Sequence, residues 1–185
     1  MSGTLLLWTM LALLLFWGVG LYNRLMRMRA RGLSAFGSVE KHLREYAELT
    51  REQTQRFQNE LENMAAVHAG DSAYGWGLLN GALQSVELAL KNARAAPLVI
   101  EPLGELALAM ATLQQIWDRL RDVPEDLAGP PMPNEMRMQW DVVTHRVETS
   151  RSGYNQILLK YNEALTQVPA RLVVGLMGFK RGGTL

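Results

Sequence analysis

Residues 5–31 read LLLWTMLALLLFWGVGLYNRLMRMRAR, and this stretch decides how the rest of the chain is placed. Its first 17 residues carry no charge and are almost continuously apolar. As a helix they span about 26 Å, the short end of what crosses a bilayer core. Trp8, Trp17 and Tyr22 are amphipathic aromatics of the kind that lie at membrane interfaces. The stretch therefore predicts a transmembrane helix over residues 5–22, preceded by the short segment 1–4.

The arginines after this apolar run predict its orientation. A cleaved signal peptide is the alternative, but it would carry its basic residues before the run and a small-x-small cleavage site after it. Here Arg24, Arg27, Arg29 and Arg31 follow the run and no basic residue precedes it. The positive-inside bias places such a flank in the cytoplasm. We expect a single-pass protein with an extracytoplasmic N-terminus and the bulk of the chain in the cytoplasm.

The net charge of +1 hides a polarised distribution. Seven of the 19 basic residues and none of the 18 acidic residues lie in the two ends, before Glu40 and after Glu163. The part between them is therefore acidic, with 12 basic against 18 acidic residues. If the C-terminal end returns to the membrane, the basic ends form one collar there. We define the basic collar as Arg24, Arg27, Arg29, Arg31, Arg171, Lys180 and Arg181.

Four amphipathic segments with the period of an α-helix follow the anchor. The first continues from the anchor without proline, and a loop with four prolines over residues 124–133 precedes the last. Their apolar positions recur every three or four residues, which is typical of helices packed nearly parallel. We predict an all-α fold, an elongated antiparallel four-helix, coiled-coil-like bundle over residues 23–169. The expected core positions are Phe36, Val39, Leu43, Tyr46, Leu49 or Thr50, Phe57, Leu61 and Met64; Trp76, Leu79, Leu83, Val86 and Leu90; Leu103, Leu106, Met110, Leu113, Trp117 and Leu120; Met136, Trp140, Val143, Val147, Tyr154, Leu158, Tyr161 and Leu165.

An up-down bundle brings the C-terminal tail, residues 170–185, back toward the membrane. The tail is apolar in its middle and basic on both sides, a pattern typical of interfacial segments. Folding onto the open end of the bundle would bury the same side chains equally well, and both alternatives stay open. The residues concerned are Leu172, Val173, Leu176, Met177 and Phe179.

No group of residues has the spacing of a catalytic, metal or cofactor site. The chain has no cysteine, which excludes disulfides, thiolate metal ligands and cysteine nucleophiles. His42, His68 and His145 lie in different predicted helices, and none belongs to an HExxH motif. Nucleic-acid binding is disfavoured because the body of the chain is acidic. We expect no enzymatic activity, no cofactor, no metal and no nucleic-acid partner.

Motifs at both ends of the chain are similar to those of a known family. Tyr22-Asn23 opens the arginine-rich stretch, and near the other end Tyr154-Asn155 and Tyr161-Asn162 precede Pro169 and Gly178-Phe179-Lys180. In this order and spacing they resemble the opening and closing motifs of the LemA family of bacterial membrane proteins. The resemblance is to a divergent member, because the family's tryptophan-aspartate and LIPNLV motifs are missing. It implies an N-out anchor in the bacterial inner (cytoplasmic) membrane, a cytoplasmic helical bundle and no catalytic residues.

The two Tyr-Asn pairs also have a physical interpretation of their own. Residues seven apart share one face of a helix, so the tyrosines align on one face and the asparagines on its neighbour. Such asparagines are typical register devices for helix packing, within a chain or between chains.

These features together favour a structural function. We expect a non-enzymatic, membrane-anchored scaffold that self-associates into a homo-oligomer, binds anionic lipid headgroups and organises or shapes the bacterial membrane. Apolar positions near residues 57–64 or 136–143 are expected to remain open for other subunits. The alternative is a monomeric, membrane-tethered adaptor that recruits an unidentified partner protein through its acidic distal end.

Overall fold

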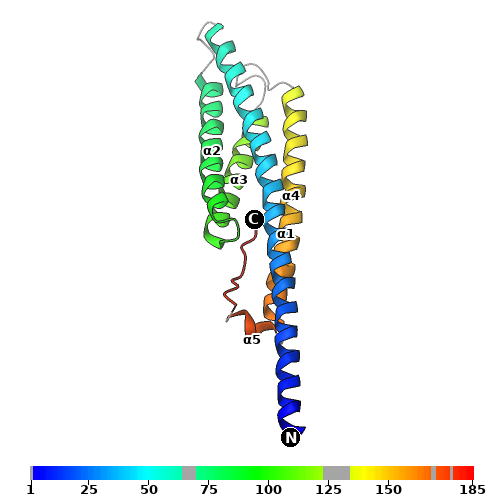
Figure 1. Cartoon of the computed structure of the whole chain (residues 1–185). Helices are drawn as coiled ribbons and strands as arrows, with labels where there is room; N and C mark the ends of the chain where they lie inside the picture. The colour runs from blue at the N-terminus through cyan, green and yellow to red at the C-terminus, as the bar shows by residue number, and fades with distance from the viewer. Residues whose placement is uncertain (1, 64–69, 123–133, 168–169, 176) are drawn as a thin grey trace.

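The computed structural model describes residues 2–63, 70–122, 134–167, 170–175 and 177–185. Within these ranges the chain forms helices and no strands (Figure 1). The helices are α1 (Ser2–Asn63), α2 (Gly70–Ala95), α3 (Ile100–Arg121), α4 (Asn134–Thr166) and the short α5 (Ala170–Val174). The prediction of an all-α fold with a long N-terminal helix is confirmed.

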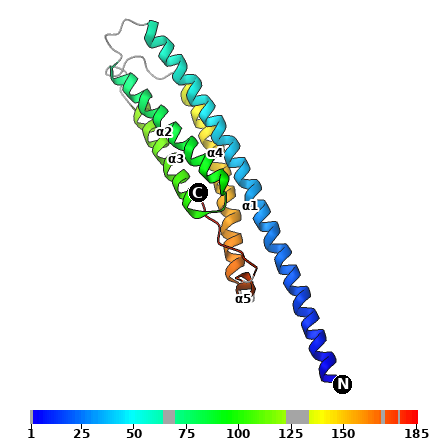
Figure 2. The ribbon, with the colours of Figure 1, turned by 60° about the vertical axis from the view of Figure 1, so that its left-hand side comes forward.

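Helix α1 is uninterrupted over 62 residues, and its first third projects beyond the rest of the molecule (Figure 2). The apolar side chains there are exposed, including Leu7 at 67% and Phe16 at 81%. By length and composition this is a helix that can cross a membrane. Leu25 is the first fully buried side chain, so the bundle begins just after the apolar run.

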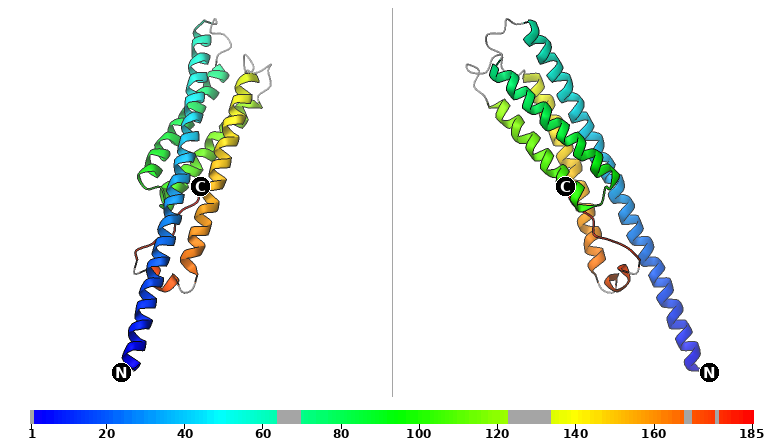
Figure 3. Two further views of the ribbon diagram at one scale, coloured as in Figure 1. Left: turned by 45° about the vertical axis from the view of Figure 1, so that its right-hand side comes forward. Right: turned by 90° about the vertical axis from the view of Figure 1, so that its left-hand side faces the viewer.

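The four long helices run alternately up and down, with α4 antiparallel to α1 (Figures 1 and 3). The most extensive contacts join α1 to α4 and α2 to α3, and α1 also packs on α2. Gly32 allows one close approach, because a Cβ there would lie 3.1 Å from a methyl group of Leu158 on α4. The α2–α3 hairpin is the shorter pair, so the lower parts of α1 and α4 extend below its turn at residues 96–99 (Figure 1).

The core follows the predicted apolar positions. Trp117 and Trp140 stack with ring centroids 3.8 Å apart, and Tyr46 lies 4.2 Å from Trp140. These rings join α1, α3 and α4 in the upper part of the bundle. Leu49, Met110, Leu120 and Val143 are only partly buried, and Phe57, Leu61 and Met64 lie outside the described side chains. The remaining predicted positions are buried: Phe36, Val39, Leu43, Tyr46, Thr50, Trp76, Leu79, Leu83, Val86, Leu90, Leu103, Leu106, Leu113, Trp117, Met136, Trp140, Val147, Tyr154, Leu158, Tyr161 and Leu165.

Candidate functional site at the lower end of the bundle

The two Tyr-Asn pairs of α4 bind the backbone of the C-terminal tail. The side-chain amide of Asn155 donates to the Leu185 carbonyl (2.6 Å) and its oxygen accepts from the Leu185 N–H (2.8 Å). Asn162 makes the same pair of hydrogen bonds with Gly182, at 2.8 and 2.9 Å. Each asparagine thus satisfies both polar groups of one tail residue, as a neighbouring β-strand would.

The tyrosines support the same extended segment. Tyr161 donates to the Lys180 carbonyl at 3.0 Å. The hydroxyl of Tyr154 lies 2.9 Å from the Pro97 carbonyl and 3.0 Å from that of Gly183, so it links the tail to the α2–α3 turn. Burial raises the pKa of Tyr154 and of Tyr161, because the charged phenolate would be poorly solvated. Both hydroxyls therefore remain donors at neutral pH. We call these four residues of α4 the Tyr-Asn ladder.

The spacing of the ladder matches an extended chain. Seven helical residues separate the rungs and rise about 10.5 Å, while three extended residues span about 10 Å. The bound tail residues are three apart: Lys180 and Gly183 on the tyrosines, Gly182 and Leu185 on the asparagines. The seven-residue spacing of the Tyr-Asn pairs thus matches the extended C-terminal tail that they bind. The sequence alone predicted instead that these residues set the register between packed helices.

Two adjacent glycines let the tail lie this close. A Cβ at Gly182 would collide with Leu158, and one at Gly183 would lie 2.8 Å from the Ile100 Cα. The Gly183 N–H also donates to the Leu98 carbonyl at 3.0 Å. The tail consequently fills the space beside α1 and α4 that lies below the α2–α3 hairpin (Figure 1). The backbone partners of this contact were not identified from the sequence as site residues: Pro97, Leu98, Gly182, Gly183 and Leu185. The adjacent glycines at 182–183 were the one sequence feature that could have indicated a close approach of the tail.

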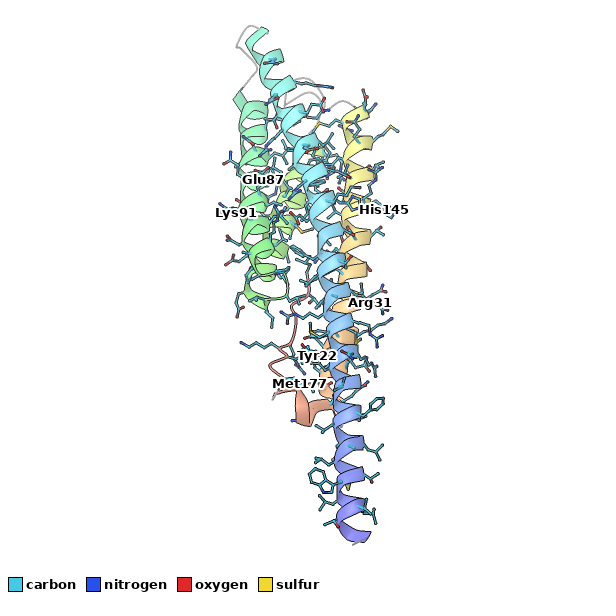
Figure 4. All side chains as sticks on the ribbon, in the orientation of Figure 1. Tyr22, Arg31, Glu87, Lys91, His145 and Met177 are labelled. Atoms are coloured by element: carbon cyan, nitrogen blue, oxygen red, sulfur yellow. The ribbon has the colours of Figure 1, made fainter. Side chains whose placement is uncertain are left out.

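The lower half of the tail lies where α1 leaves the bundle. Phe179 is 8% exposed, and its ring centroid lies 5.7 Å from that of Tyr22. Met177, labelled in Figure 4, is partly buried against the core. Of the residues considered for a membrane interface, these two pack on the bundle. Leu176 and the side chains of Leu172 and Val173 lie outside the described part of the structure.

The basic collar is exposed throughout, and part of it converges. All seven side chains are exposed, and none forms an ion pair with another described residue. Three of them, Arg29 of α1 with Lys180 and Arg181 of the tail, line one cavity of about 490 Å³. We call it the basic cavity; Tyr161 and Glu101 also line it.

A larger groove of about 750 Å³ opens between α1, α3 and α4, above the end of the tail. Leu43, Leu113 and Val147 are among the apolar residues that line it. Tyr46 of α1 makes polar contacts with both other helices at the groove. Its hydroxyl lies 3.3 Å from Gln114 Oε1 of α3 and 3.4 Å from Thr144 Oγ1 of α4. Burial raises the pKa of Tyr46. We call this the upper groove.

An apolar patch lies on the outer face of α1 and α4. It consists of Leu49, Met138 and Val142, and Met138 and Val142 are 70% and 51% exposed. Met136 and Trp140 alternate with them and point into the core. The stretch 136–143 is thus partly open, while the side chains of Phe57 and of residues 60–64 are not described. That these positions contact another subunit stays a prediction. We call this the outer patch.

The histidines do not converge in the described structure. His42 Nδ1 lies 3.1 Å from Glu45 of the same helix, a contact that lowers the pKa of Glu45. His145 projects outward from α4 (Figure 4), and His68 lies outside the described residues. No group of three or more potential metal ligands occurs among the described residues.

Comparison of the chain with protein-family models, with curated proteins and with solved structures gave no match.

Proposed function

We propose that this chain is a non-enzymatic, membrane-anchored scaffold that self-associates side by side and organises or shapes the bacterial inner membrane. The outer patch is the observation that carries the proposal. With α1 in the bilayer and its N-terminus outside, all copies stand parallel. Leu49 then lies about 40 Å above residue 22 in every copy, so the patches face one another at one height.

The energetics favour such lateral contact. Burying an exposed large apolar side chain contributes about 1.5–3 kcal/mol, and each copy offers Met138 and Val142 one turn apart. Anchoring in a shared bilayer removes much of the orientational cost of association and raises the effective concentration. A patch that would be too small for a stable dimer in solution is therefore sufficient in a membrane.

The basic collar supports the action on the membrane. Each Lys or Arg near an anionic leaflet contributes about 1 kcal/mol of attraction, and all seven collar residues are exposed. An oligomer repeats this charge around its base. The resemblance to the LemA family supports the same placement, with an N-out anchor and a cytoplasmic bundle.

Reconstitution into anionic vesicles tests the proposal. The full chain should alter vesicle curvature or spacing in electron cryo-micrographs, and Met138→Glu with Val142→Glu should abolish the effect. Gln84→Glu with Leu88→Glu is the matched control, because it adds the same two charges to exposed positions of α2. Vesicles that stay unchanged by the unaltered chain, or respond equally to both double variants, would refute the scaffold.

The upper groove favours a second candidate function, a tethered adaptor that binds an extended segment of another protein. Val147 and Glu148 lie seven residues before Tyr154 and Asn155, so they continue the same face of α4, and both line the groove. The charged residues that line the groove are three acidic and two basic: Asp118, Asp122, Glu148, Arg119 and Arg151. Glu148 pairs with Arg151 and Asp118 with Arg121, so the remaining charge of the groove is weakly negative, which suits a segment that is apolar and mildly basic. The tail docks in an extended form on the neighbouring part of this face, which supports the proposal.

A labelled peptide of alternating valine and lysine tests the adaptor in uncharged detergent micelles. Ala111→Trp fills the groove and should weaken binding at least about tenfold, whereas Leu108→Trp, exposed on the same helix outside the groove, should not. Equal binding to both variants would rule out the groove as a peptide site.

A further inference from the structure

The basic cavity has an excess of positive charge that the described structure leaves uncompensated. Arg29, Lys180 and Arg181 line it, with Glu101 as its one acidic lining residue. None of these four forms an ion pair with another described residue. Three cations around one space repel each other, and an anion between them relieves that repulsion.

The cations come from two separate segments that the ladder brings together. Arg29 lies on α1, seven residues beyond Tyr22. Lys180 and Arg181 lie on the tail, where Tyr161 binds the Lys180 carbonyl and Asn162 binds Gly182. The geometry of the cavity therefore depends on the docked tail.

The other walls suit an amphiphilic anion. Leu98, Val99 and Ile100 line the cavity from the α2–α3 turn, and Val99 and Ile100 are 44% and 58% exposed. Helix α3 begins here without a side-chain cap, so its first N–H groups add a partial positive charge to the same wall. Apolar surface beside cationic surface matches a phosphate that carries hydrocarbon.

The height of the cavity also fits a lipid. Arg29 lies about 10 Å beyond residue 22, and the headgroup layer extends about 5–8 Å from the hydrocarbon. An arginine side chain covers the remaining distance. The assignment of a lipid to the cavity rests on the proposed membrane placement of α1, whereas the cavity itself and its charge do not depend on that placement.

We infer that the basic cavity is a binding site for a phosphate group, supplied by an anionic lipid headgroup that enters from the cytoplasmic leaflet. Arg29 and Arg181 donate paired N–H groups to the phosphate oxygens, and Lys180 adds a third charge. One cavity per chain gives one tightly held lipid, distinct from the diffuse attraction of the whole collar. Free inorganic phosphate shares this chemistry and is the competing source.

The full chain in uncharged detergent micelles, titrated by calorimetry, tests the site. One arm uses short-chain phosphatidylglycerol and phosphatidic acid as probes, and the other uses inorganic phosphate. We expect about one equivalent of lipid to bind. Binding of the lipids but not of phosphate identifies the headgroup as the source; equal affinity for phosphate would overturn the lipid assignment.

Two charge-matched triple variants locate the binding. Arg29→Gln with Lys180→Gln and Arg181→Gln should weaken the affinity at least about tenfold. Arg24→Gln with Arg27→Gln and Arg171→Gln removes the same charge from collar residues outside the cavity and should weaken it less than about threefold. Equal losses in the two variants, or no saturable binding to the unaltered chain, would overturn the inference.

A further variant separates the site from general charge and from self-association. Asn162→Leu retains every charge but releases the Lys180–Gly182 segment, so it should weaken lipid binding about as much as the cavity triple variant. Unchanged binding would show that the docked tail is not needed. The particle mass, measured in parallel, reports on the scaffold separately: single-chain particles with intact lipid binding would refute the scaffold alone.

Discussion

At the scale of single residues, docking of the tail depends on side chains that are small or that bind backbone. Gly182 and Gly183 carry no Cβ where α4 and the start of α3 approach most closely. Asn155 and Asn162 satisfy N–H and C=O groups that would otherwise be buried without partners. The tail is thus recognised through its backbone and through the absence of side chains at two positions.

Opposite effects of two glycine substitutions test this close approach. Gly183→Ala should lower the unfolding temperature, because the new Cβ would lie 2.8 Å from the Ile100 Cα and backbone must move, at about 1–3 kcal/mol. Gly153→Ala in α4 should raise it, since nothing lies within 4 Å and alanine favours the helix by up to about 1 kcal/mol. Circular dichroism measures both; a stabilising Gly183→Ala would contradict the packing.

The asparagine contacts predict a local change in hydrogen exchange. Asn155→Leu removes two hydrogen bonds to Leu185, worth about 1–3 kcal/mol together. Amides of residues 182–185 should then exchange at least about tenfold faster, with those of α2 unchanged. Gln156→Leu, at the adjacent exposed position, is the control. Equal exchange in the two variants would show that Asn155 does not hold the tail.

The buried Tyr154 hydroxyl predicts a loss of stability in alkali. Burial raises its pKa above the ordinary value near 10, so the unfolded chain loses this proton first as pH rises. The stabilisation is therefore complete below about pH 10 and declines above it. Urea unfolding should show a steeper fall between about pH 10 and pH 12 for the unaltered chain than for Tyr154→Phe. Parallel curves would contradict the assignment.

At the scale of elements, the helices could be predicted because each carries its own apolar period. The positions Leu79, Leu83 and Val86 are buried as their spacing indicates, and the chain direction follows from short connections. Neither the side of the bundle that the tail takes nor the upper groove could be predicted. An apolar segment with basic flanks can pack against lipid or against the bundle core equally well. Hydrogen bonds from side chains to backbone produce no periodic pattern in the sequence, so the docking of the tail could not be recognised from it.

The proposed orientation of α1 rests on its flanking arginines, and it can be measured directly. The chain has no cysteine, so single cysteines can be placed freely. In intact cells, Gly3→Cys should react with a membrane-impermeant maleimide, and Ser152→Cys on α4 should react only after lysis. Both positions belong to exposed residues. The reverse pattern would place the bundle outside and remove the basis for a cytoplasmic scaffold.

At the scale of the whole molecule, the bundle is asymmetric. The tail closes its lower end, whereas the upper groove and the outer patch remain open on different sides. The candidate span lies directly below, with the basic collar between it and the acidic body. In the proposed scaffold, parallel copies in one bilayer would meet through their outer patches and leave their grooves accessible.

The mass of the extracted particle measures self-association most directly. One chain weighs 20.8 kDa, so native mass spectrometry of the full chain in mild uncharged detergent distinguishes every subunit number. We expect particles of several chains, reduced to single chains by Met138→Glu with Val142→Glu and unaffected by Gln84→Glu with Leu88→Glu. Particles of one unaltered chain at every protein concentration would contradict the scaffold and leave the adaptor as the better description.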